Sequence, residues 1–400
     1  MKKKSVLLPI FLIVAVDILG LTIVLPLLPF YAEHFGATPF VVGTLVTLYA
    51  ACQLVAGPLL GRISDRTGRR PLLLVSQVGT FIGFIVLASA GSLWMVFLSR
   101  FIDGITAGNL SLAQAYISDV TEPKDRAKSF GIIGIAFGMG FLFGPAISGF
   151  LAQYNYRYPI IAAAALSLTS IIATYFLLPR ERPVHAQEAG PAGKRLSIVD
   201  WSAYAKFFRR PDLAPVLLQF FMFCLAFSTF QSGFALFAER RFTHNGLPFG
   251  PKQVGYLFAY AGFLGVILQG GLIGRLVKRF GEEKLAVSGF FAAMIGYTCV
   301  GLTWHVPALL GAMAMSSYGT GILRPALTSL VSQRAHRNEQ GVVLGLNQSL
   351  NSIAQIIAPL CSGLLIQNGQ LLPWALLASV PCAVGLILSR RQRSITAAAG

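Results

Sequence analysis

The chain has 400 residues, of which 55% are hydrophobic and only 12% are charged, and it carries a formal net charge of +17. A soluble protein of this length would need about twice that charged fraction, so the composition argues against a soluble domain. The apolar runs are continuous rather than alternating, which argues against a transmembrane β-barrel. We therefore predict an all-α membrane protein.

Apolar stretches of the length that crosses a bilayer, about 20 residues, recur from end to end. The N-terminal stretch is followed by no small-residue cleavage site, so we interpret it as a retained first span and not as a signal peptide. The sequence predicts twelve transmembrane helices, at residues 6–31, 40–60, 71–90, 94–118, 129–153, 159–178, 213–238, 253–274, 285–304, 306–331, 341–366 and 372–388.

Basic residues mark one side of these spans. Most of the 32 lysines and arginines lie at the two termini and in the loops on the same side, whereas the opposite loops hold only Arg157, Arg240, Arg241 and Lys252. By the positive-inside rule, both termini face the cytoplasm. The basic charge is thus a signal of membrane orientation, and we expect the lipid bilayer, not nucleic acid, as its partner.

A polar stretch divides the spans into two halves. We expect an N-terminal six-helix bundle over residues 1–178, a cytoplasmic linker over 179–212 and a C-terminal six-helix bundle over 213–400. Within the linker, Trp201 and Phe208 share one helical face, which predicts an amphipathic helix at the inner membrane surface.

The two halves repeat each other. GRISDRTGRR at 61–70 corresponds to GRLVKRFGEE at 274–283, and the glycines and proline of the fifth span recur in the eleventh. In transporters built from such repeats, the substrate site lies between the halves near the membrane midplane, and rocking of the halves gives alternating access.

Four stretches fall in order at matching topological positions: DILGLTIVLPLLP in the first span, GRISDRTGRR after the second, SRFIDGITAGN in the fourth and GIIGIAFGMGFLFGPAISG in the fifth. Together they resemble the major facilitator superfamily, particularly its twelve-span drug:proton antiporters, which include the tetracycline efflux pumps. The resemblance implies two pseudo-symmetric six-helix bundles in the bacterial inner membrane.

The charged loop after the second span has two interpretations. Its glycines permit a tight turn, and its arginines can simply anchor it in the cytoplasm. Asp65 adds nothing to such anchoring, however. The resemblance implies that Asp65 docks on a second-half span and that Arg69 pairs with an acid such as Asp119, forming a latch that stabilises the outward-open state. The candidate latch comprises Gly61, Asp65, Arg66, Gly68, Arg69, Arg70 and Asp119.

Ionisable residues within the spans are functional candidates, because charge in the membrane is costly. Burial favours the uncharged form of a carboxyl group, so Asp17, near the middle of the first span, can take up and release a proton. Arg100 is the first-half intramembrane cation available to pair with it; alternatively, Arg100 and Asp103 compensate each other. Candidates for proton coupling are Asp17, Asp103 and Arg100.

The fifth span is rich in glycines at small-xxx-small spacing, which predicts close helix packing. The resemblance implies that its antiporter motif also controls leak between the halves. The motif residues are Gly131, Gly140, Gly144, Pro145 and Gly149.

The seventh span carries six phenylalanines along one helical face. Helix or lipid packing explains such a stripe, and so does an aromatic surface for substrate, since the resemblance places this span beside the cavity. Arg324 is a further candidate for substrate binding. Alternatively, its side chain snorkels to the inner membrane surface. The candidate substrate-binding residues are Gln114, Phe227, Gln231, Phe234, Arg324, Asn347 and Asn351.

No phosphate-binding loop, metal-binding pattern or catalytic motif is present in the sequence. We therefore expect no enzyme activity, no metal and no cofactor, with the proton gradient as the energy source. We expect a monomer whose partners are protons and a small-molecule substrate.

The leading hypothesis is a proton-coupled antiporter that exports amphipathic or aromatic drugs. The alternative is a transporter of an endogenous sugar or lipid-like metabolite by antiport or facilitated diffusion, and a receptor or channel is a third possibility. Tetracycline pumps carry an acid at the third-span position that is Gly83 here, which implies a different substrate or stoichiometry.

Overall fold

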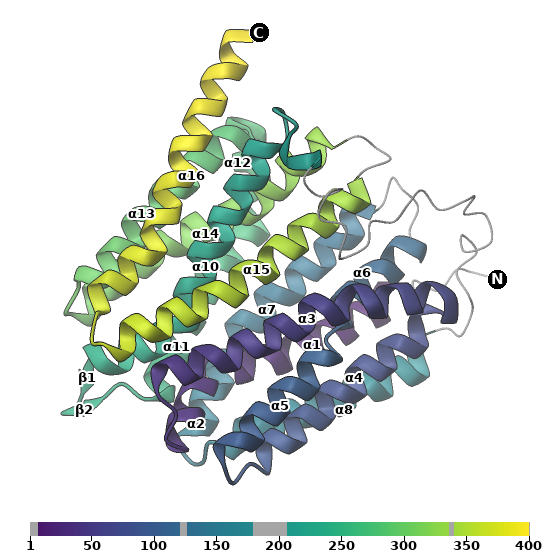
Figure 1. The fold of residues 1–400 in the computed structure, drawn as a ribbon, viewed down its shortest axis with the longest axis vertical. Helices are drawn as coiled ribbons and strands as arrows, with labels where there is room; N and C mark the ends of the chain where they lie inside the picture. Colours follow the sequence, from purple (N-terminus) through teal and green to yellow (C-terminus); the bar gives the residue numbers. More distant parts are fainter. Residues whose placement is uncertain (1–6, 121–125, 179–205, 336–339, 400) are drawn as a thin grey trace. The chain divides into compact units, whose positions relative to one another are not determined.

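The computed structural model describes residues 7–120, 126–178, 206–335 and 340–399, which form helices and one small hairpin (Figure 1). By length and composition, ten of the described helices can cross a membrane. An eleventh span results if α1 (Leu7–Val24) and α2 (Leu28–His34), which are bent by 42° at a short break, are one span.

The predicted fourth span is divided into α5 (Leu93–Ile105) and α6 (Asn109–Val120), each too short to count as a span alone. Ser76 of α4 (Arg69–Ala88) fills the break between them. Its hydroxyl donates to the carbonyl of Thr106 and accepts a hydrogen bond of 2.9 Å from the N–H of Gly108. A break inside a membrane span needs such partners, because lipid offers none to exposed backbone groups.

The contacts divide the chain into two units. Unit 1 contains Met1–Ala37, Leu48–Gly193 and Gly250–Tyr260, and unit 2 contains Thr38–Thr47, Lys194–Phe249 and Ala261–Gly400. The two units are not contiguous in the sequence, because the first residues of two helices are grouped with a different unit from the rest of the same helix. The start of α3 (Pro39–Thr67) belongs to unit 2, and the start of α11 (Pro251–Ile267) belongs to unit 1. Most of the expected linker and its amphipathic helix lie outside the described residues.

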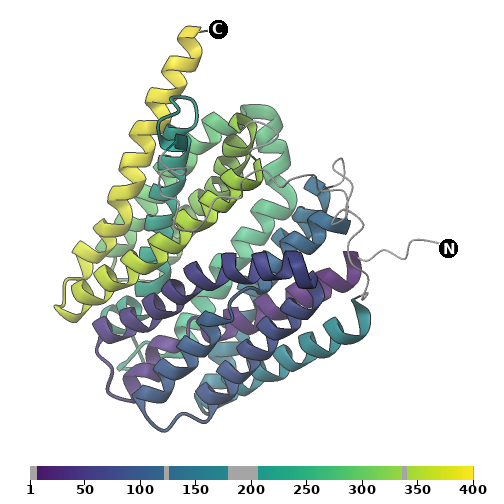
Figure 2. The same cartoon turned by 45° about the vertical axis from the view of Figure 1, so that its right-hand side comes forward.

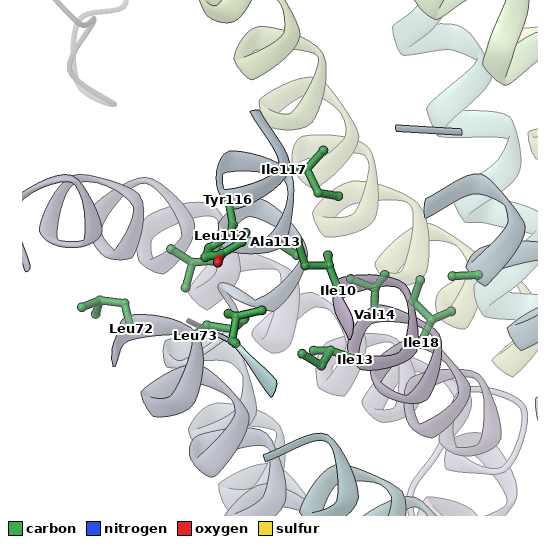
Figure 3. Packing of buried hydrophobic residues seen from close by; sticks show 12 residues of the cluster. Ile10, Ile13, Val14, Ile18, Leu72, Leu73, Leu112, Ala113, Tyr116 and Ile117 are labelled. Atoms are coloured by element: carbon green, nitrogen blue, oxygen red, sulfur yellow. The ribbon is translucent and has the colours of Figure 1, made fainter. Parts of the chain in front are cut away.

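In unit 1, α1 packs against α7 (Arg126–Ala152) and α8 (Arg157–Leu177), and α4 packs against α5 and α8. Apolar residues three and four positions apart give α1 a continuous face. Figure 3 shows this face meeting α4 and α6 in a buried cluster that includes Ile10, Ile13, Val14, Ile18, Leu72, Leu73, Leu112, Ala113, Tyr116 and Ile117.

In unit 2, α10 (Ala214–Arg241) packs against α15 (Gln340–Gln367) and α16 (Leu371–Ala399), and α13 (Glu282–Leu302) packs against α14 (Val306–Arg334) and α16 (Figure 2). The phenylalanine stripe of α10 contributes to this core. Phe237 stacks on the buried Trp374 at 4.8 Å between ring centroids, and Phe230 stacks on Tyr297 at 5.0 Å.

Equivalent turns follow the repeated loop motif. Gly68 separates α3 from α4 with φ of +98°, and Gly281 separates α12 (Ile273–Phe280) from α13 with φ of +76°. Only glycine enters this region without steric cost, which explains its presence at both turns. Between α11 and α12, the segment Leu268–Leu272 is a π-helix.

The loop after α10 contains a hairpin that the sequence analysis did not anticipate. Strands β1 (Thr243–His244) and β2 (Leu247–Pro248) pair antiparallel around Asn245 and Gly246. Both turn residues have positive φ, as the Asn-Gly turn of a tight hairpin requires.

Candidate functional site

Asp17 lies on α1 and contacts uncharged polar side chains from two other helices of unit 1. Gln77 of α4 donates from Nε2 to the Asp17 carboxylate at 3.4 Å and to the hydroxyl of Ser170 on α8 at 2.8 Å. Gln77 and Ser170 are fully buried, whereas Asp17 is only partly buried. The carboxyl group is therefore held in place by neutral groups and not by a counter-ion.

Arg100 pairs with Asp103 and not with Asp17. The Nη1 atom of Arg100 lies 3.4 Å from the Asp103 carboxylate one turn along α5, and both side chains are almost completely buried. This is the compensating arrangement; the pairing of Arg100 with Asp17 is not formed. A pair at i and i+3 needs no helix other than its own to bring its partners together.

Gly83 leaves space for this pair. A Cβ atom at Gly83 on α4 would lie 3.1 Å from the Cβ of Asp103 and 3.2 Å from the carbonyl oxygen of Ser99. The side of α4 that carries Gly83 therefore faces Asp103, an acid of the neighbouring helix α5.

Arg69 organises the loop between α3 and α4. Its Nε donates to Asp119 of α6 at 2.9 Å, and its Nη1 lies 2.5 Å from Asp65 in the last turn of α3. The same nitrogen donates to the hydroxyl of Ser64 at 2.6 Å and to the carbonyl of Gly61 at 3.3 Å. One guanidinium thus ties together the ends of three helices.

The other two arginines of the candidate latch point elsewhere. Arg70 lies over the ring of Tyr175 on α8, 5.4 Å from its centroid, and donates to the Tyr175 carbonyl. Arg66 is exposed at the end of α3. The structure thus brings Gly61, Asp65, Arg69 and Asp119 together and leaves the role of Arg66 a prediction.

Two glycines of the antiporter motif hold α7 against α1. A Cβ atom on Gly140 would lie 2.6 Å from Ile18, and one on Gly144 would overlap Thr22. The Thr22 hydroxyl uses this close approach to donate to the Gly140 carbonyl at 2.8 Å. Gly131 also belongs to α7, but its surroundings lie outside the described part of the chain.

The remaining motif residues, Pro145 and Gly149, meet the start of α11 inside unit 1. A Cβ atom on Gly149 would lie 2.9 Å from the carbonyl oxygen of Pro251, and one on Gly255 would overlap the carbonyl oxygen of Pro145. The contact is reciprocal, since each helix presents a glycine to the proline carbonyl of the other. We call it the α7/α11 Pro-Gly crossing.

Unit 2 contains a second contact of the same kind, the α3/α15 Pro-Gly crossing. A Cβ atom on Gly43 would overlap the carbonyl of Pro359, and one on Gly363 would overlap the carbonyl of Pro39. In all four helices the proline precedes the glycine by four residues, which places them one turn apart on one face. In the sequence, Pro145 and Gly149 were recognised as motif residues, and their repeat in the eleventh span as Pro359 and Gly363. The members on α3 and α11 were missed, although the P-x-x-x-G spacing was visible there too.

Burial separates the candidate substrate residues. Phe234 is completely buried, with its ring 4.8 Å from that of Phe230, so it belongs to the core of unit 2. Asn347 is also buried, and its amide has no hydrogen-bond partner among the described residues. The residues that remain accessible are Gln114 and Arg324, which are exposed, and Phe227, Gln231 and Asn351, which are partly buried.

Comparison with known proteins gives a consistent result over nearly the whole chain. The family described as Major Facilitator Superfamily matches residues 10–359 and, in a second match, residues 246–394. The chain is 32% identical to the class E tetracycline resistance protein of Escherichia coli, covering 87% of this chain and 84% of the relative. It is 28% identical to multidrug resistance protein 1 of Bacillus subtilis, covering 97% of each.

Solved structures share the fold. The human organic anion transporter MFSD10 (TETRAN) superposes with a TM-score of 0.76 at 22% identity, covering 97% of this chain and 100% of that one. The nucleoside transporter NupG superposes with a TM-score of 0.73 at 14% identity, covering 98% of this chain and 99% of that one.

Proposed function

The chain belongs to the Major Facilitator Superfamily, and from this premise we propose that it is a proton-coupled antiporter that exports small amphipathic or aromatic drugs by alternating access. It is a multi-pass protein of the bacterial inner membrane with both termini in the cytoplasm. Similarity to tetracycline and multidrug resistance proteins over nearly the full length supports export as the direction. The observation that carries the proposal is Asp17, a membrane-embedded acid with no counter-ion among the described residues.

Neutral partners suit Asp17 to proton transfer. A cation beside the carboxylate would hold it in the charged form, whereas the Gln77 amide can donate to it in either form. In the proposed cycle, Asp17 accepts a proton from the outside and releases it to the cytoplasm, and bound substrate favours the release by competing for the same region. Arg100 and Asp103 stay paired beside it as a neutral unit.

The proton gradient supplies the energy, and no cofactor is involved. Moving one proton inward yields about 2.3 kcal/mol per 100 mV of membrane potential and about 1.4 kcal/mol per pH unit. A gradient of ordinary size therefore suffices to concentrate a drug outside the cell by roughly a hundredfold or more, since each 1.4 kcal/mol is tenfold in a ratio.

The Arg69 cluster and the two Pro-Gly crossings are the proposed conformational elements. Arg69 and its acids form a latch on the cytoplasmic side, where each charge-assisted hydrogen bond contributes about 1.5–3 kcal/mol. The crossings lie where α3 and α11 begin, on the predicted outer side. In the proposed cycle they form when the outer side closes and separate when it opens.

The test is Asp17→Asn, which mimics the protonated side chain. In inside-out vesicles with an imposed pH gradient, the variant should lose uphill drug accumulation but still exchange bound drug without a gradient. Asp212→Asn removes an exposed cytoplasmic acid and serves as the control, with transport expected to stay unchanged. Full gradient-driven accumulation by Asp17→Asn would show that Asp17 is structural and would remove the basis of the proposal.

A further inference from the structure

Arg324 occupies an interior position on α14. It lies ten residues before the end of the helix at Arg334, which is about 15 Å along the helix axis. At about 100° per residue, it lies on the opposite side of α14 from the exposed Met315. Its guanidinium carbon is instead 5.8 Å from the ring centroid of Phe227 on α10, the most buried of the candidate membrane-spanning helices.

The positive charge of Arg324 has no carboxylate partner in the described part of unit 2. Every described acid of that unit bonds to another group at a helix end. These pairs are Asp212 with Arg210, Glu239 with Arg240, Glu282 with Ser329 and Gln333, and Glu283 with Arg334. An uncompensated guanidinium within a membrane span is costly, and such residues mark substrate or ion pathways.

The surroundings of Arg324 leave its donors available. An aromatic ring covers the face of a guanidinium, whereas the N–H groups point outward in its plane, where two of them can bind one carboxylate. Gln231 lies one turn from Phe227 on the same side of α10. It is partly buried, and its amide bonds to no described residue, so it offers a donor and an acceptor beside the ring.

We propose that Arg324, Phe227 and Gln231 form a subsite that binds the acidic group of an aromatic substrate. The proposed ligand is an aromatic carboxylate. Its ring packs beside Phe227, and its carboxylate binds the in-plane N–H groups of Arg324. The Gln231 amide accepts a hydrogen bond from the ligand or donates one to it. This inference rests on the proposed export function and adds to it the chemistry that selects substrates.

The experiment compares three probes with one ring system: 1-naphthoate, the neutral 1-naphthamide and the cationic 1-naphthylmethylammonium. Calorimetric titration into the full-length protein in lipid nanodiscs should show that naphthoate binds most tightly. Arg324→Gln should weaken naphthoate by roughly ten- to a hundredfold and leave naphthamide nearly unchanged. Arg324→Lys keeps the positive charge but lacks the planar guanidinium group, so it should retain only part of the preference for naphthoate.

Arg279→Gln is the matched control, because Arg279 also lies over a phenylalanine ring in unit 2, at 5.4 Å, but on an exposed helix end. It should leave all three affinities unchanged. A naphthoate preference that survives Arg324→Gln, or the absence of such a preference in the unaltered protein, would overturn the subsite. Gradient-driven export of a drug panel by the same preparation tests the proposed function separately, because it does not depend on which probe binds best.

Discussion

Gly363→Ala tests whether the α3/α15 Pro-Gly crossing has to form during transport. The added methyl group would lie 2.8 Å from the Cα of Phe40 and 2.9 Å from the carbonyl carbon of Pro39. Carbon atoms in ordinary contact are about 3.5–4.0 Å apart, so the start of α3 must move back by about 1 Å. Overpacking of this size costs about 1–3 kcal/mol, which lowers the population of the closed crossing by roughly 5- to 150-fold.

The assay is a distance distribution between spin labels at Thr38 and Asn368, two exposed residues near the ends of the helices involved. Gly363→Ala should lengthen the distance and slow gradient-driven export. Gly345→Ala adds the same methyl group to α15 where nothing lies within 4 Å, so it should behave like the unaltered protein. Equal distances and equal transport in the two variants would refute the requirement for close approach.

Two further predictions concern the latch and the aromatic stripe. Asp119→Asn should weaken the hydrogen bonding of Arg69 and shift the ratio of the resting conformations by roughly tenfold. Labels on the ends of α3 and α6 nearest Arg69 can detect this shift; an unchanged ratio would leave the loop as a topology anchor only. Phe234→Ala should destabilise the protein by about 2–4 kcal/mol through the cavity it leaves, whereas Phe227→Ala should preserve the melting temperature and reorder the transported compounds. Equal decreases in melting temperature for Phe234→Ala and Phe227→Ala would contradict the assignment of Phe234 to the core and of Phe227 to substrate binding.

Several properties followed from the sequence because they depend on composition and local spacing. Continuous apolar runs indicated the membrane helices, and the distribution of lysine and arginine predicted the orientation. Gly68 and Gly281, at equivalent places in the repeat, predicted matching turns, and both adopt the positive φ that such turns need. Polarity and glycine geometry act over a few residues, so they can be read without knowing how the chain packs.

Contacts between distant helices could be decided only by the tertiary structure. The position of Asp17 within the first apolar stretch identified an acid inside a membrane span. Nothing in the sequence indicated that Gln77 and Ser170, and not Arg100, would be its neighbours. Helical periodicity shows which residues share a face, yet it does not say which helix meets that face. In a membrane this ambiguity is larger than in water, because lipid-facing and packed faces are equally apolar.

The aromatic stripe and the Pro-Gly crossings illustrate the same limit. Phe227 and Phe234 occupy equivalent positions along α10 in sequence, but only Phe227 meets Arg324, while Phe234 is enclosed by other rings. The P-x-x-x-G spacing of Pro39 and Gly43 was visible in the sequence, whereas its match with α15 was not. Sequence therefore determined the apolar helices and the candidate acid and predicted their orientation, and packing between helices decided which of the candidate residues meet.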